Sequence, residues 1–212
     1  MMGAREVAII AYQGVDELDL MGVLAPLRKA EEAAKGALRT RVIGPGSFRG
    51  GCGSLITPDQ TFCDPFDFAA LDALVLPGGK GAQAAVKDPH LSHFVLAARA
   101  AGAPIYAVCS GALILRDLAL LKGLCVASHG QKQDLLAGAG CTLGSGVIRD
   151  QWLVSAGGFG PGDGLKGAEV AFHVLRDLAP QLVMGVAERM ELWPQTREQS
   201  AAAIGVEVEG VG

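Results

Sequence analysis

Short runs of consecutive apolar residues recur along the chain, and segments with the spacing of amphipathic helices separate them. The runs are rich in valine, isoleucine, leucine and alanine, and they end at glycine, proline or polar residues, as buried parallel strands do. They predict strands over 7–12, 39–44, 72–77, 104–108 and 124–128, with extended segments near 147–148 and 152–155. The intervening patterns predict helices over 17–34, 82–101, 110–121, 132–137, 165–178 and 181–190, and a glycine-rich hairpin over 50–61.

The alternation of strands and helices predicts the fold class. It indicates an α/β protein, a three-layer sandwich around one mostly parallel, doubly wound sheet with right-handed crossovers. The chain has 212 residues and shows no internal repeat or long linker. We therefore expect a single domain over 1–194, followed by an irregular C-terminal tail over 195–212.

Doubly wound sheets bind ligands beyond the carboxyl ends of their strands. Three segments directly follow predicted strands: 13–19, 77–81 and Cys109. The predicted sheet brings these strand ends to one edge. Candidate functional residues are therefore expected in these three segments.

Cys109 lies where an apolar strand passes directly into an apolar helix. It must occupy the turn itself, and Gly111 permits close approach of the helix backbone. A nucleophile is presented above a sheet by such a turn, and the following helix N-terminus favours a thiolate. The sequence thus predicts a reactive cysteine that is ionised at neutral pH. A buried structural cysteine is the alternative, since most free cysteines are of that kind.

The other four cysteines lack this pattern. Cys125 is expected in a strand core, Cys141 is expected to be structural, and Cys52 and Cys63 flank the hairpin with no partner base expected nearby. An odd number of cysteines at irregular spacing forms neither a disulfide framework nor a zinc pattern. We expect a reducing, cytoplasmic setting.

Composition and charge exclude several function classes. Half of the residues are hydrophobic and the net charge is −4, with no concentrated basic face for nucleic acid. No apolar stretch is long enough to span a membrane, and Arg5 and Glu6 lead directly into the first strand, unlike a signal peptide. The four histidines lack the spacing of a metal site.

The motifs around these strand ends resemble the ThiJ/PfpI superfamily, which is related to class I glutamine amidotransferases and includes a deglycase. Leu-Pro-Gly-Gly79 follows one strand, and Ala-Val-Cys109-Ser-Gly-Ala follows the next. Segments 12–22, 121–129 and 147–158 are similar to the isonitrile hydratase subgroup in particular. The likeness extends from about Val7 to about Pro194, and it implies a flavodoxin-like, class I glutamine amidotransferase-like fold.

The resemblance also implies roles for individual residues. Asp19 matches the carboxylate that contacts the nucleophile Cys109, and the N–H groups of Gly79 and Ser110 match positions that stabilise developing negative charge. On the residues alone, the preferred interpretation of Asp19 is an acid favoured by the helix dipole in a first turn capped by Asp16, and the resemblance reverses that preference. Gly78 and His129 are possible pocket residues, and His129 is also interpretable as a structural histidine. The resemblance further implies a small-molecule substrate, no cofactor or metal, and a homodimer.

The departures from the family pattern narrow the activity. Ser110 stands where protease-like members carry histidine, and Asp19 stands where deglycase-like members carry glutamate. The histidine of Ser128-His129-Gly130 lacks the bulky aromatic neighbour of the subgroup, which predicts an altered pocket. His173, His90 and His93 are interpreted as structural. The glycine-rich segment 157–164 is interpreted as a pocket-wall loop, because it lacks the lysine of a P-loop.

These observations predict a cysteine-dependent lyase that hydrates isonitriles to N-substituted formamides through a covalent thioimidate. Two alternatives stay open. One is a glyoxalase- or deglycase-type enzyme acting on α-oxoaldehydes. The other is a non-enzymatic ligand- or redox-sensing domain.

Overall fold

The structure is a computed structural model that describes residues 4–158 and 165–191. Its central sheet has seven strands in the order β10-β11-β7-β6-β1-β2-β5, and all neighbours are parallel except β10 and β11. The strands of this sheet are β1 (Arg5–Ile10), β2 (Leu38–Gly44), β5 (Gln60–Thr61), β6 (Leu71–Leu76), β7 (Ile105–Val108), β10 (Gly146–Asp150) and β11 (Leu153–Gly157). The mostly parallel α/β architecture is thus as predicted.

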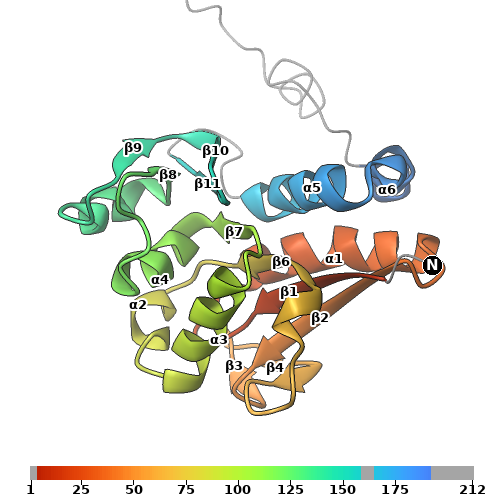
Figure 1. Ribbon diagram of the computed structural model, residues 1–212, viewed down its shortest axis with the longest axis horizontal. Helices are drawn as coiled ribbons and strands as arrows, with labels where there is room; N and C mark the ends of the chain where they lie inside the picture. Colours follow the sequence, from red (N-terminus) through yellow and green to blue (C-terminus); the bar gives the residue numbers. More distant parts are fainter. Residues whose placement is uncertain (1–3, 159–164, 192–212) are drawn as a thin grey trace, which may run out of the picture.

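Helices cover both faces of the sheet, which gives the predicted three layers (Figure 1). One face carries α1 (Glu17–Ala33), α5 (Lys166–Leu178) and α6 (Val183–Met190), and the other carries α2 (Ala82–Ala85), α3 (Pro89–Ala100) and α4 (Ala112–Asp117). Short 3₁₀ helices are η1 (Phe68–Ala70), η2 (Cys109–Gly111), η3 (Gly130–Leu136) and η5 (Pro180–Leu182).

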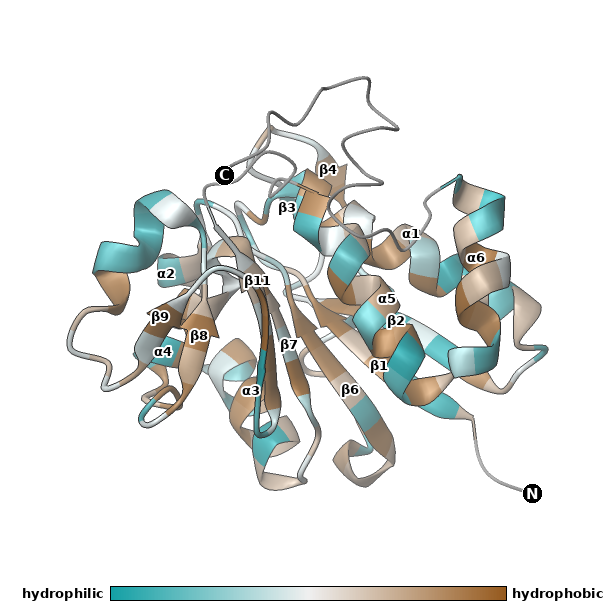
Figure 2. Ribbon diagram, turned by 90° about the horizontal axis from the view of Figure 1, so that it is seen from above, coloured by the Kyte–Doolittle hydropathy of each residue, from teal (hydrophilic) through white to brown (hydrophobic). Residues whose placement is uncertain are grey.

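The hydrophobic core lies on both faces of the central strands. Residues 7–10 of β1, 73–76 of β6 and 105–108 of β7 are buried throughout. Figure 2 shows the same strands as mostly hydrophobic ribbons between more polar helices. Burial on both faces explains why these strands appear in the sequence as continuous apolar runs instead of alternating patterns.

Two predicted helices have different bounds in the structure. The helix over 82–101 is divided into α2 and α3, because the Asp88 side chain caps the new helix and Pro89 occupies its first turn. The helix over 110–121 begins as η2 and ends at Asp117, four residues early. Its end is followed by Ala119 in the left-handed conformation (φ 57°), which does not continue a right-handed helix.

The small strands also differ from the prediction. The hairpin predicted over 50–61 is the antiparallel pair β3 (Phe48–Arg49) and β4 (Leu55–Ile56), whereas β5 joins the edge of the central sheet. The strand predicted over 124–128 is β8 (Cys125–Ala127), which leaves the central sheet and pairs with β9 (Thr142–Gly144). The tail over 195–212, and most of the glycine-rich loop over 157–164, lie outside the described residues. Within the described parts of the chain, no helix is both long and apolar enough to cross a bilayer.

Candidate active site

The three segments singled out in the sequence meet at Gly78, beyond the end of β6. A Cβ atom added to Gly78 would lie 2.7 Å from Asp19 Oδ2, 2.7 Å from the Ser110 nitrogen and 2.9 Å from Cys109 Cβ. These separations are far below van der Waals contact, so only glycine fits at the centre of the group. The structure therefore brings together Asp19, Gly78, Cys109 and Ser110, as the sequence predicts for residues that follow neighbouring strands.

Cys109 occupies the sharp turn between β7 and η2. Its backbone is in the left-handed region (φ 56°), which non-glycine residues rarely adopt. Two contacts hold the turn: the buried Ser128 hydroxyl donates to the Cys109 carbonyl at 3.0 Å, and Gly111 lies against β6, where an added Cβ would be 2.1 Å from the Leu76 oxygen. Strained backbone of this kind is typical of functional sites.

Asp19 is buried in the first turn of α1, facing Cys109. Its Oδ2 accepts a hydrogen bond from the Gly78 N–H at 3.0 Å, and this oxygen and the Cys109 Cβ both lie against Gly78. Asp16 caps the helix by accepting from the Leu18 and Asp19 nitrogens, so the capping role belongs to Asp16 alone. Burial, and then the charge of Asp16, raise the pKa of Asp19 to about 6 in spite of the hydrogen bond from Gly78.

The Cys109 thiol is not ionised at neutral pH, contrary to the sequence prediction. Burial, and then the negative charge of Asp19, raise its pKa to about 12, and the Ser110 N–H opposes this only in part. The helix that should have lowered the pKa is short, since α4 has six residues and begins only after a 3₁₀ turn. The resting pair at neutral pH is therefore a thiol beside a carboxylate.

Gly79 and Ser110 contact each other more closely than the sequence indicated. The Gly79 N–H donates a hydrogen bond to Ser110 Oγ at 2.9 Å. The Ser110 hydroxyl in turn donates to the Gly79 carbonyl at 3.1 Å. The prediction that the Gly79 N–H faces a substrate is therefore not met in this geometry. The Ser110 N–H, in contrast, acts on Cys109, where it lowers the pKa of the thiol.

His129 serves as a helix cap in this structure. Its Nδ1 accepts from the Gln131 N–H at 3.2 Å and so begins η3. Because Nδ1 is an acceptor in this contact, the ring proton of neutral His129 belongs on Nε2. His129 can therefore offer a donor to a ligand, and this contact gives it a structural role as well.

The expectation that Cys52 and Cys63 have no partner is wrong. The Glu17 carboxylate hydrogen-bonds to Cys52 and raises the pKa of that thiol, and Cys63 Sγ lies 3.9 Å from His90 Nδ1. Both cysteines are exposed, and neither occupies a turn like that of Cys109. Across residues 4–158 and 165–191, no three histidine, cysteine or acidic side chains gather as metal ligands.

Tyr12 belongs to the site but was not selected from the sequence. It is buried near the end of β1, and its hydroxyl donates to the Pro77 carbonyl at 2.7 Å. The signal was available: tyrosine is the only polar side chain in the apolar run 7–12, and it stands at the strand end that leads to Asp19.

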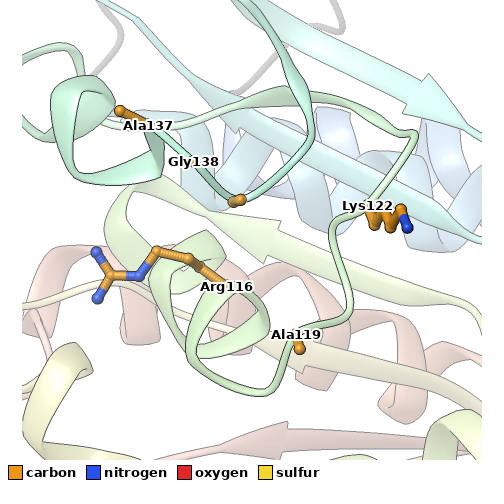
Figure 3. A pocket seen from close by; sticks show the side chains of 6 residues that line it. Arg116, Ala119, Lys122, Ala137 and Gly138 are labelled. Carbon is orange, nitrogen blue, oxygen red and sulfur yellow. The ribbon is translucent and has the colours of Figure 1, made fainter.

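A separate surface pocket of about 360 Å³ lies at the other end of α4 (Figure 3). Arg116 and Lys122 line it, but their side chains point to different sides. Arg116 is also bound to Asp117 and to the Leu135 carbonyl. Because its charges do not converge, this pocket is a poor candidate for the functional site.

A match to the DJ-1/PfpI family covers residues 5–167. The chain belongs to the DJ-1/PfpI family. Among curated relatives, it is 26% identical to the isonitrile hydratase of Pseudomonas putida over 160 residues, which are 75% of this chain and 68% of that enzyme. The sequence resemblance to ThiJ/PfpI proteins is thus confirmed at the level of the family.

Solved structures support the same fold. A ThiJ/PfpI family protein from Pseudomonas syringae superposes with a TM-score of 0.75 and 27% identity, covering 92% of this chain and 78% of that one. A two-domain protein from Anabaena variabilis, with DJ-1/ThiJ/PfpI-like and ferritin-like domains, superposes with a TM-score of 0.70 and 23% identity. That match covers 82% of this chain but only 48% of the larger protein.

Proposed function

We propose that this DJ-1/PfpI protein hydrates isonitriles to N-substituted formamides, with Cys109 as nucleophile and Asp19 as the acid and base. The observation that carries the proposal is the meeting of Cys109 and the buried Asp19 carboxylate at Gly78, where burial and then the charge of Asp16 raise the pKa of Asp19 to about 6. A carboxylate with such a pKa exchanges protons readily near neutral pH. The similarity to an isonitrile hydratase supports the choice of substrate class.

The reaction would proceed through a covalent thioimidate. Asp19 takes the thiol proton as Cys109 Sγ forms a bond to the terminal isonitrile carbon, and Asp19 then delivers that proton to the same carbon. Asp19, ionised again, next removes a proton from water, whose oxygen adds to this carbon. The proton that Asp19 took from water passes to the nitrogen, which gives a neutral tetrahedral intermediate. As the carbon–sulfur bond breaks, the hydroxyl proton of this intermediate returns through Asp19 to sulfur, the formamide is released, and no cofactor is consumed.

The neighbouring backbone favours each charged stage. The Ser110 N–H stabilises negative charge as it develops on sulfur, and the Gly78 N–H stabilises the ionised Asp19. Gly79 is proposed to support the site indirectly through its paired contacts with Ser110, and could donate to a substrate only if its bond to Ser110 Oγ opens. Gly78 and His129 are proposed as pocket residues, with His129 Nε2–H as the available donor.

The proposal is tested by incubating the purified protein with an alkyl isonitrile and measuring the formamide by mass spectrometry. We expect turnover by the wild type, none by Cys109→Ala, and a loss of about 10²–10⁴-fold in Asp19→Asn, the range for a general acid–base group. Cys63→Ala is the matched control and should retain activity, because Cys63 lies outside the site. Turnover by Cys109→Ala at the wild-type rate would exclude the cysteine as nucleophile.

The same thiol–carboxylate pair could also add to an aldehyde carbon, so α-oxoaldehydes are the competing substrate class. Methylglyoxal in the same assay distinguishes the two activities: turnover of methylglyoxal without turnover of any isonitrile would favour a glyoxalase or deglycase. If Cys109 is oxidised by dilute peroxide and no substrate is turned over, a sensing role is favoured instead.

We also propose that the protein acts in the cytoplasm as a homodimer on a small molecule. All five cysteines are unpaired, which suits a reducing compartment. The dimer follows from the family resemblance, and fractionation and sedimentation measurements test the two statements separately.

A further inference from the structure

The Pro77–Gly78 peptide group is hydrogen-bonded at both ends. Its carbonyl, the Pro77 oxygen, accepts from the Tyr12 hydroxyl at 2.7 Å, and its N–H, that of Gly78, donates to Asp19 Oδ2 at 3.0 Å. A peptide group is planar and rigid, so its C=O and N–H cannot reorient independently. The two hydrogen bonds are therefore coupled through a single amide.

Tyr12 is well placed to fix this peptide. The side chain is 2% exposed, and the hydroxyl donates across from the end of β1 to the residue that follows β6. The adjoining backbone is also held, since the Asp16 N–H donates to the Gly78 carbonyl at 2.8 Å. Residues 12 and 16, in the segment between β1 and α1, thus hydrogen-bond to the Pro77–Gly78 segment. Asp19 follows in the first turn of α1.

We propose that Tyr12 is a positioning residue that acts on Asp19 through the Pro77–Gly78 peptide. By holding the carbonyl, Tyr12 keeps the Gly78 N–H aimed at the carboxylate. By donating to the carbonyl, it also polarises the amide and makes that N–H a stronger donor, as in other hydrogen-bond chains. Tyr12 does not touch a substrate in this scheme. The inference rests on the proposed role of Asp19 as acid and base.

The environment of Tyr12 keeps its hydroxyl a donor. Burial, followed by the charges of Asp19 and Cys109, raises the pKa of Tyr12 well above its ordinary value. The phenol therefore stays protonated wherever Asp19 titrates, so the donation to Pro77 does not switch off during the reaction.

The test is Tyr12→Phe, which keeps the buried ring and removes only the hydroxyl. Without it, the Gly78 N–H should support the carboxylate less well, so the protonation midpoint of Asp19 should rise by about 0.3–1 pH unit. The midpoint is measured by carbon NMR on protein labelled at the aspartate carboxyl carbons, with the Asp19 signal assigned by its absence in Asp19→Asn. This readout needs no substrate, so it gives a result even if isonitrile hydration fails.

Tyr106→Phe is the matched control. Tyr106 is the only other tyrosine of the chain; it is fully buried, and its hydroxyl binds Asp177. Losing it should lower stability comparably but leave the midpoint of Asp19 unchanged. An unchanged midpoint in Tyr12→Phe, or an equal shift in both variants, would overturn the inference.

A second measurement holds even if Tyr12→Phe does not fold. In the Tyr106→Phe background, 3-fluorotyrosine can enter only at Tyr12, and the more acidic phenol is a stronger donor. The inference then requires the midpoint of Asp19 to fall, opposite to the shift in Tyr12→Phe. A midpoint that stays fixed or rises would contradict the proposed path through the peptide.

Discussion

The charge state of single residues determines what the Cys109 turn can do. With the pKa of Asp19 raised to about 6 and that of Cys109 raised to about 12, one proton resides on sulfur and the carboxylate is ionised at neutral pH. Two negative charges side by side in a buried site would repel each other. Attack and proton transfer therefore have to occur together, which makes Asp19 as important to the nucleophile as the turn that presents it.

Holding Asp19 ionised in the interior has a cost that depends on pH. Its pKa is 3.8 in the unfolded reference and about 6 in the fold, so the folded state binds more protons between these values. The contribution of Asp19 to stability is thus greatest below pH 3.8 and is lost as the pH rises through 6. About two pK units correspond to about 3 kcal/mol at pH 7.

Asp19→Asn should remove this pH dependence. The amide oxygen can still accept from the Gly78 N–H, and no buried charge remains at neutral pH. We expect the variant to gain up to about 3 kcal/mol over the wild type at pH 7, and progressively less toward pH 4, in urea denaturation. Asp88→Asn, at the surface cap of α3, is the control and should follow the wild-type pH dependence. A stability difference that does not change between pH 4 and 7 would contradict the assignment.

At the scale of elements, the β3–β4 hairpin braces the junction that carries Asp19. The Gly51 N–H donates to the Val15 carbonyl at 2.7 Å. The Glu17 carboxylate, in the first turn of α1, accepts from the Cys52 nitrogen at 2.9 Å and the Ser54 nitrogen at 3.2 Å. Although burial opposes it, these N–H donors lower the pKa of Glu17 to about 2, so the contact persists at neutral pH.

Replacing Glu17 by glutamine should loosen the hairpin. A neutral acceptor binds backbone N–H groups less strongly than a carboxylate, so amide exchange at residues 52 and 54 should accelerate by about tenfold. Hydrogen exchange followed by NMR measures this directly. Glu32→Gln removes a charge from the far end of α1, where Glu32 binds Arg189, and should leave the hairpin amides unchanged. Equal acceleration in both variants would show that helix charge, not the contact, is responsible.

The elements themselves were largely predictable, because strands buried on both faces must be apolar throughout. One difference from the predicted strands is at β8. β8 is apolar enough for the central sheet, yet its Ala127 N–H donates to the Ser155 hydroxyl of β11, and the strand pairs with β9 instead. Ala127 and Ser155 are 28 residues apart in the sequence, so a pattern of neighbouring residues cannot predict their hydrogen bond.

At the scale of the whole molecule, strand order is what assembles the site. The ends of β1, β6 and β7 adjoin in the sheet, so residues that follow them in sequence could be predicted to meet. The pKa values of Asp19 and Cys109 could not be predicted from the sequence, since they depend on burial and on how close the two side chains lie. The pairing of the Gly79 N–H with the Ser110 hydroxyl was equally hidden, because motif spacing does not show which donors are already occupied.

The proposed homodimer requires an apolar face on the outside of the molecule. Leu18 and Met21 lie one turn apart on α1 and are 54% and 44% exposed, and Leu55 on β4 is 68% exposed. Glu17 joins the two segments, since it precedes Leu18 and accepts from the nitrogen of Ser54, which precedes Leu55. Exposed large apolar side chains of this kind are typical of interfaces between proteins.

A charge on this face should therefore separate the subunits. In sedimentation velocity runs at micromolar concentration, we expect the wild type to sediment as a dimer and Met21→Glu as a monomer, because an unpaired carboxylate would be buried at the interface. Leu96→Glu is the control: Leu96 is similarly exposed, at 43%, but lies on α3 across the sheet, so its variant should remain dimeric. If Leu96→Glu dissociates while Met21→Glu does not, the dimer uses the α3 face. Because α1 also carries Asp19, a dimer through the α1 face would place the partner subunit beside the site. Met21→Glu should then change the rate of substrate turnover as well as the mass of the sedimenting species.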